Sequence, residues 1–205
     1  MQTINKINWA ILVTGWGRNA VDTLKAYANE KLGSGHRISL VLYESEPCGA
    51  AELAVNIGVE TLQLKRKDFK DSEIYQKKIV EELQNRNIDY IFMLNYKYII
   101  RKNMLSAFPS RIINIHPSLF PSFLGTKTAI QDALAYGVKI TGITTHIIDD
   151  KVDEGEILCQ VAIKVKDEDT FDTLYPKFSK KGAKLIIKTM KKVESLHINT
   201  VGNNE

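Results

Sequence analysis

Short, continuous apolar runs alternate along this chain with longer segments that repeat their apolar residues at helical spacing. In the first half the apolar runs fall at residues 9–14, 38–44, 90–94 and 111–115, and a further strand is expected at residues 60–64. Because apolar positions in these runs are consecutive, both faces of each strand must be buried, as in a parallel sheet with helices on either side. The pattern predicts an α/β fold built from repeated strand–helix units.

The segments between these strands carry helix signals. One helical pattern opens at Asn19, and a second, over residues 50–58, ends at Gly58, which suits the left-handed position after a helix. Asp71 or Ser72 is expected to cap the third helix, because either side chain can accept hydrogen bonds from its first free N–H groups.

The second half of the chain has a different order. A helix over residues 128–136 closes at Gly137, and two β runs follow at 140–148 and 156–165, joined by an acidic, turn-rich connection typical of a hairpin or meander. A long final helix is expected over residues 170–193. The predicted sheet is therefore open and mainly parallel, with helices on both faces, and mixed at its C-terminal end.

Length and charge fit one domain. The 205 residues carry a net charge of +4 and two cysteines without a CxxC pair, so we expect a single domain over residues 1–195 and a frayed tail over 196–205. No leader-like segment is found, nor an apolar run near the ~18 residues that span a bilayer. These features predict a cytoplasmic protein that binds neither membranes nor nucleic acid, and the mild positive charge suits a small anionic substrate.

The final predicted helix carries lysines at three- and four-residue steps. They are Lys177, Lys180, Lys184, Lys188 and Lys191. A solvated face is the simpler interpretation, and contact with a polyanion is the alternative.

Three polar clusters directly follow predicted strands, at residues 15–19, 95–97 and 114–118. Open α/β sheets bind ligands beyond the carboxyl ends of their strands, near the point where strand order reverses. We therefore expect the three clusters to converge on one site.

The first cluster has the elements of an anion site. Gly15 and Gly17 follow the first strand, and Asn19 is expected to cap the next helix, which would expose backbone N–H groups at its positive end. Arg18 adds a charge. The cluster lacks the third glycine of a dinucleotide fingerprint and the Lys-Ser/Thr of a P-loop, so a plain tight turn is the alternative.

The second cluster ends the fifth strand with Asn114 and His116. Residues two apart on a strand point the same way, so both side chains should face one cavity. Asn114 supplies a neutral amide donor and His116 a donor or a titrating base, while Pro117 fixes the backbone just beyond them. The alternative is a strand-end amide and a histidine satisfied within the core.

Asp153 stands apart from the other acids of the connection before the last strand. It lies between Val152 and a Glu-Gly turn, where the chain could point one carboxylate inwards and favour a protonated His116. Two other assignments use the same residue types. His116, His146 and Asp153 could bind zinc, although no HxH or HxxxH pair is present, and Ser118 could be a nucleophile, although no GxSxG motif surrounds it.

Two stretches of the chain resemble the folate-dependent formyltransferases. They are INIHPSLFPSFLG, residues 113–125, and GVKITGITTHIIDDKVDEGEILCQ, residues 137–160. The resemblance extends over roughly residues 9–165 and is strongest to the members that formylate glycinamide ribonucleotide in purine biosynthesis. It implies a Rossmann-like fold that transfers the formyl group of 10-formyltetrahydrofolate to a substrate amine through a tetrahedral oxyanion, without a metal.

The resemblance also implies a role for individual residues. The catalytic residues would be Asn114, His116 and Asp153. The residues around the folate would be Lys97, Tyr98, Ile99, Ile100, Ile148, Asp149 and Asp150. Those around the phosphate-bearing acceptor would be Gly15, Gly17, Arg18, Asn19 and Lys127.

The acceptor side departs from the family pattern. Arg18 replaces a serine, Ser72 replaces an arginine, and residues 124–129 lack two histidines. A formyltransferase acting on a nucleotide-linked amino sugar, a non-catalytic folate-binding protein and a hydrolase that releases formate are the alternatives. A chain of 205 residues leaves no room for the added domain of the methionyl-tRNA enzymes, and the sequence is compatible with a monomer or a homodimer.

Overall fold

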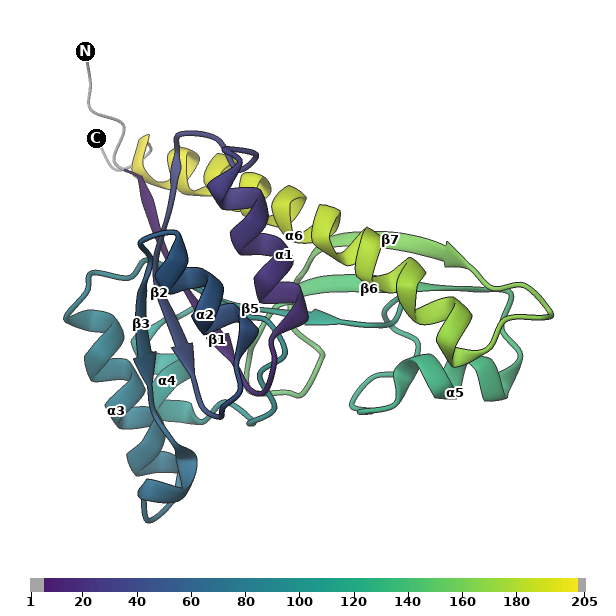
Figure 1. The fold of residues 1–205 in the computed structure, drawn as a ribbon, viewed down its shortest axis with the longest axis horizontal. Coiled ribbons are helices and arrows are strands. Elements are labelled where there is room, and N and C mark those ends of the chain that lie inside the picture. Colours follow the sequence, from purple (N-terminus) through teal and green to yellow (C-terminus); the bar gives the residue numbers. More distant parts are fainter. Residues whose placement is uncertain (1–5, 203–205) are drawn as a thin grey trace.

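The computed structural model describes residues 6–202, with side chains described as far as His197. Within that part of the chain, seven strands form one sheet in the order β3-β2-β1-β4-β5-β6-β7 (Figure 1). The strands are β1 (Ile7–Val13), β2 (His36–Tyr43), β3 (Glu60–Gln63), β4 (Tyr90–Met93), β5 (Ile112–His116), β6 (Ile140–Ile147) and β7 (Ile157–Lys164).

The strand order reverses at β1. This strand pairs in parallel with β2 and β4, and the β2–β3 and β4–β5 pairs are parallel too, whereas β5–β6 and β6–β7 are antiparallel. The prediction of a mainly parallel sheet with a mixed C-terminal end is therefore confirmed. The loops after β1 and β4 lead to helices on opposite faces, which opens a crevice between them at the carboxyl edge.

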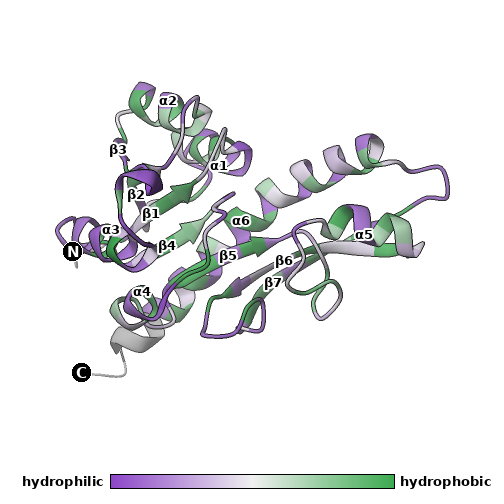
Figure 2. Ribbon diagram, turned by 90° about the horizontal axis from the view of Figure 1, so that it is seen from below, coloured by the Kyte–Doolittle hydropathy of each residue, from purple (hydrophilic) through white to green (hydrophobic). Residues whose placement is uncertain are grey.

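Six α-helices of residues 6–202 cover the sheet. They are α1 (Arg18–Ala28), α2 (Gly49–Asn56), α3 (Ser72–Gln84), α4 (Lys102–Ala107), α5 (Ala129–Tyr136) and α6 (Phe171–Gly202). Buried residues of α1, α2 and α6 pack on one face of β1 and those of α3 and α4 on the other. Figure 2 shows the central strands as mainly hydrophobic ribbons between helices of mixed colour. No helix in this described part is long and apolar enough to cross a membrane.

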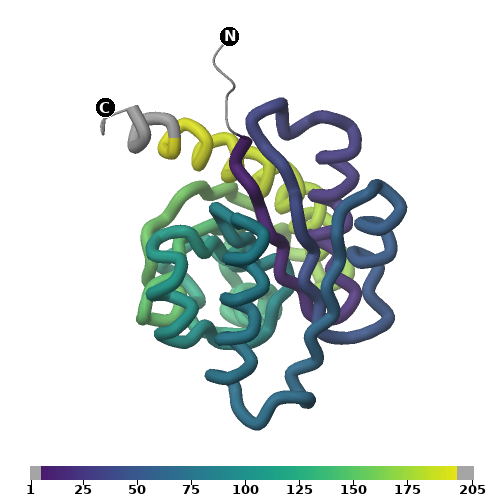
Figure 3. Tube along the Cα trace, turned by 90° about the vertical axis from the view of Figure 1, so that its left-hand side faces the viewer, coloured from purple at the N-terminus to yellow at the C-terminus, as the bar shows by residue number. Residues whose placement is uncertain are grey.

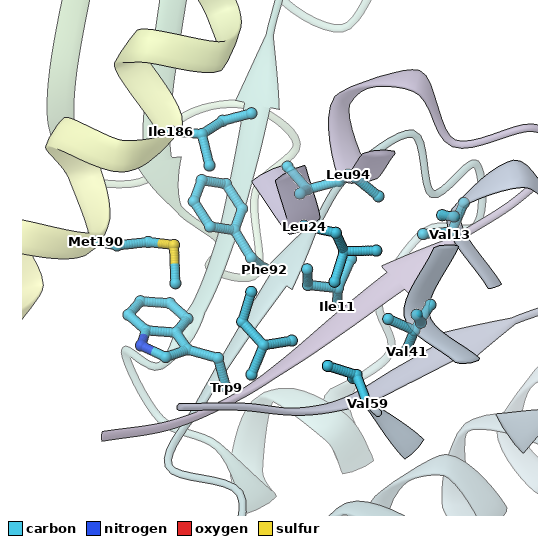
Figure 4. Close-up of a cluster of buried hydrophobic side chains, with 14 of the residues drawn as sticks. Trp9, Ile11, Val13, Leu24, Val41, Val59, Phe92, Leu94, Ile186 and Met190 are labelled. Carbon is cyan, nitrogen blue, oxygen red and sulfur yellow. The ribbon is translucent and has the colours of Figure 1, made fainter. Parts of the chain in front are cut away.

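The core of the first face is built around Trp9 of β1. Trp9 is fully buried, and Phe92 of β4 and Ile186 and Met190 of α6 belong to the same cluster (Figure 4). Burying apolar side chains of this size contributes roughly 1.5–3 kcal/mol each. The last helix is thereby held on the first strand, although the two are far apart in sequence.

A series of polar contacts also connects β1 to α6. The Trp9 Nε1–H donates to His36 Nδ1 at 3.1 Å, and His36 Nε2 lies 3.1 Å from Glu194 Oε2 on α6. His36 is 2% exposed, and burial lowers its pKa from the ordinary value, while Glu194 opposes that shift. Figure 3 shows the later part of α6 alongside the start of β1.

The helix boundaries confirm most of the sequence signals. Asp71 caps α3, accepting the N–H groups of Glu73 and Ile74 at 2.9 Å each. Gly58 and Gly137 follow α2 and α5 with φ of 74° and 76°.

Two predictions about helices need correction, and one helix was missed. Asn19 does not cap α1, because the helix begins at Arg18 with Gly17 at its N-cap. The final helix continues past Val193 to Gly202, so it passes through the predicted domain boundary at residue 195 and the first part of the predicted tail. Residues 203–205 of that tail lie outside the described residues. The short helix α4 was not predicted, since six residues are too few for an apolar period to emerge.

The lysines of α6 mostly face solvent, and two of them bond the outer strand of the sheet. Lys181 Nζ donates to the carbonyl of Ala162 at 2.6 Å, and Lys192 Nζ to that of Leu158 at 2.8 Å, both on β7. These bonds occupy carbonyls of a sheet edge that could otherwise pair with another chain. A groove of about 420 Å³ between α6 and β7 is lined by lysines and Ile163 alone, so it offers no acid–base pair.

We predict that acidification weakens the attachment of α6. Because folding lowers the pKa of His36, its contribution to stability is present above the ordinary histidine value and is lost as the pH falls through the lowered one. Urea unfolding of the wild type should give a lower midpoint at pH 5.5 than at pH 7.5, and His36→Gln should show a smaller difference. Equal pH dependence in the two proteins would contradict the assignment to His36.

Candidate active site

A cavity of about 700 Å³ opens at the carboxyl edge of the sheet, where the crevice between the β1 and β4 loops was expected. Its walls come from the loops after β4 and β5, from the β6–β7 loop and from the first half of α6. All three predicted polar clusters contribute, through Asn19, Asn95 and Asn114 among others. Their predicted convergence is therefore confirmed.

Two neighbouring strands place three polar side chains on one wall. Asn114 and His116 end β5 and face the cavity together. Across the antiparallel β5–β6 pair, Asn114 lies opposite His146 and His116 opposite Thr144. Asn114 Nδ2 and His146 Nε2 are 3.4 Å apart. Strand register thus brings His146 next to the predicted catalytic residues.

Asp153 reaches the same wall from the loop after β6. Gly155 lies so close to the Ile147 carbonyl that any Cβ would collide with it, so glycine is required for the loop to fold back. Asp153 itself has a φ of 59°, and its side chain is 11% exposed. Its Oδ2 lies 3.3 Å from His116 Nδ1 and accepts the Gly125 N–H at 3.0 Å. The carboxylate predicted to point inwards does so.

Both ring nitrogens of His116 face hydrogen-bond acceptors. Nδ1 faces the Asp153 carboxylate, and Nε2 lies 3.0 Å from the carbonyl oxygen of Phe123. A carbonyl oxygen only accepts, so Nε2 is the donor in this arrangement. The two contacts together fix the orientation of the imidazole ring.

His146 has the opposite character. Burial lowers its pKa, and the nearby Asp153 carboxylate opposes that shift without reversing it. His146 Nδ1 donates to the Ile147 carbonyl at 3.0 Å, so in the neutral ring Nε2 is the acceptor. The lone pair on Nε2 faces the side-chain amide of Asn114. The N–H₂ group of that amide, and not its oxygen, therefore points toward His146. The 3.5 Å approach of Asp153 Oδ1 to Nε2 is then a dipolar contact and not an ion pair.

The nucleophile and metal assignments find no support. Ser118 is fully buried, and its hydroxyl donates to the Ser122 carbonyl at 2.6 Å, so it does not face the cavity. His116, His146 and Asp153 lie together, yet no group of three or more His, Cys, Asp or Glu residues within 6–202 is arranged to hold a metal ion.

The residues predicted around the folate all line the cavity. They are Lys97, Tyr98, Ile99, Ile100, Ile148, Asp149 and Asp150. Two apolar side chains at its mouth, Ile99 at 63% and Val152 at 57%, are unusually exposed. An apolar rim of this kind suits a flat, partly aromatic ligand better than a fully polar one.

The residues predicted around the acceptor are only partly gathered. Asn19 and Lys127 line the cavity, whereas Gly15, Gly17 and Arg18 are not among its lining residues. The Gly15 N–H, expected to bind an anion, donates to Ser45 Oγ at 3.0 Å.

Arg18 reaches the cavity indirectly. Its guanidinium lies 5.1 Å from the ring centre of Tyr175, a lining residue of α6. This is a cation–π distance, and it sets the guanidinium beside the acceptor end of the cavity.

Sequence reasoning missed several residues of the wall. His146 was considered only as a metal ligand, although antiparallel pairing of two adjacent strands was the signal that could have placed it opposite Asn114. Asn95 was seen only as a strand-end residue. Tyr175 and Phe178 of α6 line the cavity as well, and no sequence signal distinguishes them from core residues of an amphipathic helix.

Comparison with known proteins gives a consistent set of matches. The formyl transferase family model matches residues 7–190. A phosphoribosylglycinamide formyltransferase of Bacillus subtilis (strain 168) is 28% identical over 172 residues, covering 84% of this chain and 87% of that protein. A methionyl-tRNA formyltransferase of Thermodesulfovibrio yellowstonii is 34% identical over 186 residues, covering 89% of this chain but 59% of that protein.

A solved structure agrees with these sequence matches. Glycinamide ribonucleotide transformylase 1 from Symbiobacterium toebii superposes with a TM-score of 0.88 at 29% identity, covering 95% of this chain and 90% of that one.

We predict that His146 is neutral at pH 7, with its proton on Nδ1. In ¹⁵N-resolved NMR spectra of the imidazole rings, one histidine should show an unprotonated Nε2 and should titrate below the ordinary pKa. His146→Gln should remove that signal and leave those of the other histidines. A His146 ring protonated on both nitrogens at pH 7 would contradict the proposed orientation of Asn114.

Proposed function

The chain belongs to the formyl transferase family, and from this premise we propose that it transfers the formyl group of 10-formyltetrahydrofolate to the amine of glycinamide ribonucleotide. The similarity to a phosphoribosylglycinamide formyltransferase over most of both chains supports this acceptor. A step of purine biosynthesis in the cytoplasm is part of the same proposal.

One arrangement carries the proposal. An amide donor, Asn114, stands two residues from an imidazole, His116, whose Nδ1 is held 3.3 Å from the Asp153 carboxylate. All three line one cavity. An amide N–H and a cationic N–H on the wall of one cavity are the donors that a developing oxyanion requires.

The donor supplies a formyl carbon that the acceptor amine attacks, and the carbonyl oxygen gains negative charge as the new C–N bond forms. Asn114 Nδ2 donates one hydrogen bond to that oxygen, its orientation fixed by His146. His116 Nε2–H donates the other when it leaves the Phe123 carbonyl to which it bonds in this structure. Both donors are neutral or positive, so each interaction strengthens as charge develops.

Asp153 has two tasks in this scheme. Its carboxylate keeps the proton on His116 Nδ1, so that the imidazole remains a cationic donor throughout. The attacking amine must also lose a proton, and Asp153 is the carboxylate among the catalytic residues that can accept it, directly or through a water molecule. The proton then passes to the N10 nitrogen, the bond between N10 and the formyl carbon breaks as the oxyanion collapses to a carbonyl, and tetrahydrofolate departs.

The cavity fits a folate. Its volume of about 700 Å³ lies within the roughly 300–1,000 Å³ typical of ligand sites. The loop between β4 and α4 and the β6–β7 loop form the two sides of one slot, with Ile99 and Val152 at the rim. Backbone amides and carbonyls of these loops would supply the polar contacts to a pterin ring.

The side chains near the proposed acceptor site also support a second candidate for the amine substrate. Arg18 lies against Tyr175, so this region offers a guanidinium and an aromatic ring side by side. A nucleotide-linked amino sugar carries both a diphosphate and a base, and it would use these groups more fully than a single phosphate does. It is the second candidate acceptor.

We predict that loss of the Asp153 carboxylate nearly abolishes turnover. Asp153→Asn leaves no carboxylate beside His116 Nδ1, and the rate of tetrahydrofolate release should fall by about 10²-fold or more. Glu154→Gln is the matched control, because Glu154 neighbours Asp153 but is exposed and pairs only with Lys151. Wild-type turnover in Asp153→Asn would disprove the assigned chemistry.

An acceptor screen tests the proposed substrate. Wild-type protein with 10-formyltetrahydrofolate should release tetrahydrofolate when glycinamide ribonucleotide is added, and an amino-sugar nucleotide is the comparison.

We expect Arg18→Ser to raise the KM for the preferred acceptor by about tenfold, because one charge-assisted contact is lost. Tight folate binding without transfer to any amine would favour the binding-protein alternative, and formate release without an acceptor would favour the hydrolase.

A further inference from the structure

We propose that Asn95 is a positioning residue that fixes the acceptor side of the cavity to the donor side. The inference rests on the proposed function, in which residues 14–19, called the acceptor loop, and residues 97–100, called the donor loop, bind the two substrates. Asn95 precedes the donor loop by two residues and lines the cavity.

Three hydrogen bonds join Asn95 to both ends of the acceptor loop. Its carbonyl accepts the Thr14 N–H at 3.0 Å and the Thr14 hydroxyl at 2.6 Å. Its side-chain Oδ1 accepts the Asn19 N–H at 3.2 Å. Because one residue holds the beginning and the end of the loop, these two ends cannot move apart without breaking one of these bonds.

The side-chain bond replaces a missing helix cap. Helix α1 has Gly17 at its N-cap, and glycine has no side chain to accept the first free N–H groups. Asn95 supplies the acceptor from the loop after β4. It does so with a φ of 66°, a left-handed conformation that asparagine adopts more readily than most residues. Backbone strain of this kind is retained where the surrounding contacts require it.

The anchoring also determines the wall that the acceptor meets. Asn19 Oδ1 comes within 3.9 Å of the place a Cβ on Gly182 of α6 would take, and Arg18 lies against Tyr175 of the same helix. On the donor side, Tyr96 directly follows Asn95 and is buried in the opposite core cluster. Asn95 therefore joins a loop that packs on α6 to a segment anchored in the other face of the sheet.

Replacement by glycine separates this role from a general effect on folding. Asn95→Gly removes the side-chain oxygen while allowing the positive φ without strain. Asn87→Gly is the matched control, because Asn87 also has a positive φ, 51°, but lies in the turn before β4, away from the cavity. Asn95→Asp keeps an oxygen at the same place and should retain the bond to Asn19.

We expect the exchange of the Asn19 amide hydrogen to accelerate about tenfold or more in Asn95→Gly, and to stay slow in Asn87→Gly and Asn95→Asp. The KM for glycinamide ribonucleotide should rise about tenfold in Asn95→Gly with kcat within about threefold of wild type. The Kd for tetrahydrofolate, measured by calorimetry, and the melting temperature should match those of Asn87→Gly.

Two outcomes would overturn the proposal: unchanged Asn19 exchange in Asn95→Gly, or an acceptor KM raised no more than in Asn87→Gly. A fall in folate affinity or melting temperature beyond that of the control would assign Asn95 a general structural role instead. If the wild type does not formylate glycinamide ribonucleotide, the proposed acceptor is wrong, and Asn19 exchange alone decides whether Asn95 holds the loop.

Discussion

One carboxylate holds the candidate site together. Asp153 Oδ2 contacts the His116 ring and the Gly125 N–H, while Oδ1 approaches His146. These partners belong to the end of β5, the loop that follows it and the middle of the antiparallel β5–β6 pair. The carboxylate is 11% exposed, and removing one partner of a buried charged group leaves the other uncompensated. The geometry of the whole wall therefore depends on the loop that carries Asp153, and on the glycine that lets this loop fold back.

The two histidines of the site have different hydrogen-bond partners. His116 has an acceptor at each nitrogen, the Phe123 carbonyl and the Asp153 carboxylate, whereas His146 is almost fully buried and gives its single proton to a backbone carbonyl. A neutral His146 accepts from the Asn114 amide; a protonated one could not. His146 thereby fixes the direction of the amide donor, and the two acceptors around His116 fix the direction of its ring.

The sequence predicted most of the sheet but only part of the site. The sheet depends on local signals, whereas much of the site depends on contacts between residues far apart in the chain. Continuous apolar runs and the glycines after α2 and α5 are local signals, so strands and most helix ends were found. Asn114 and His116 share a strand, and period two places them on one face. His146 needed the register of an antiparallel pair, Asn95 needed a contact across 76 residues, and α6 continued beyond its expected end. Long-range contacts of this kind leave no periodic trace in one sequence.

The two ends of the cavity differ in whether backbone groups or side chains line them. This difference accounts for why the sequence follows the family pattern at one end and departs from it at the other. The proposed donor side is lined by the loop after β4 and the β6–β7 loop, whose backbone groups are present whatever side chains they carry. The acceptor end is formed by side chains, with Lys127 in the wall and Arg18 held on Tyr175. Two of the backbone N–H groups expected to bind an anion there are already bonded, Gly15 to Ser45 and Asn19 to Asn95. Under the proposed function, recognition of the acceptor depends more on the guanidinium and ammonium groups than on the start of α1. Acceptor choice could then change through a few side chains without a change in the proposed catalytic residues.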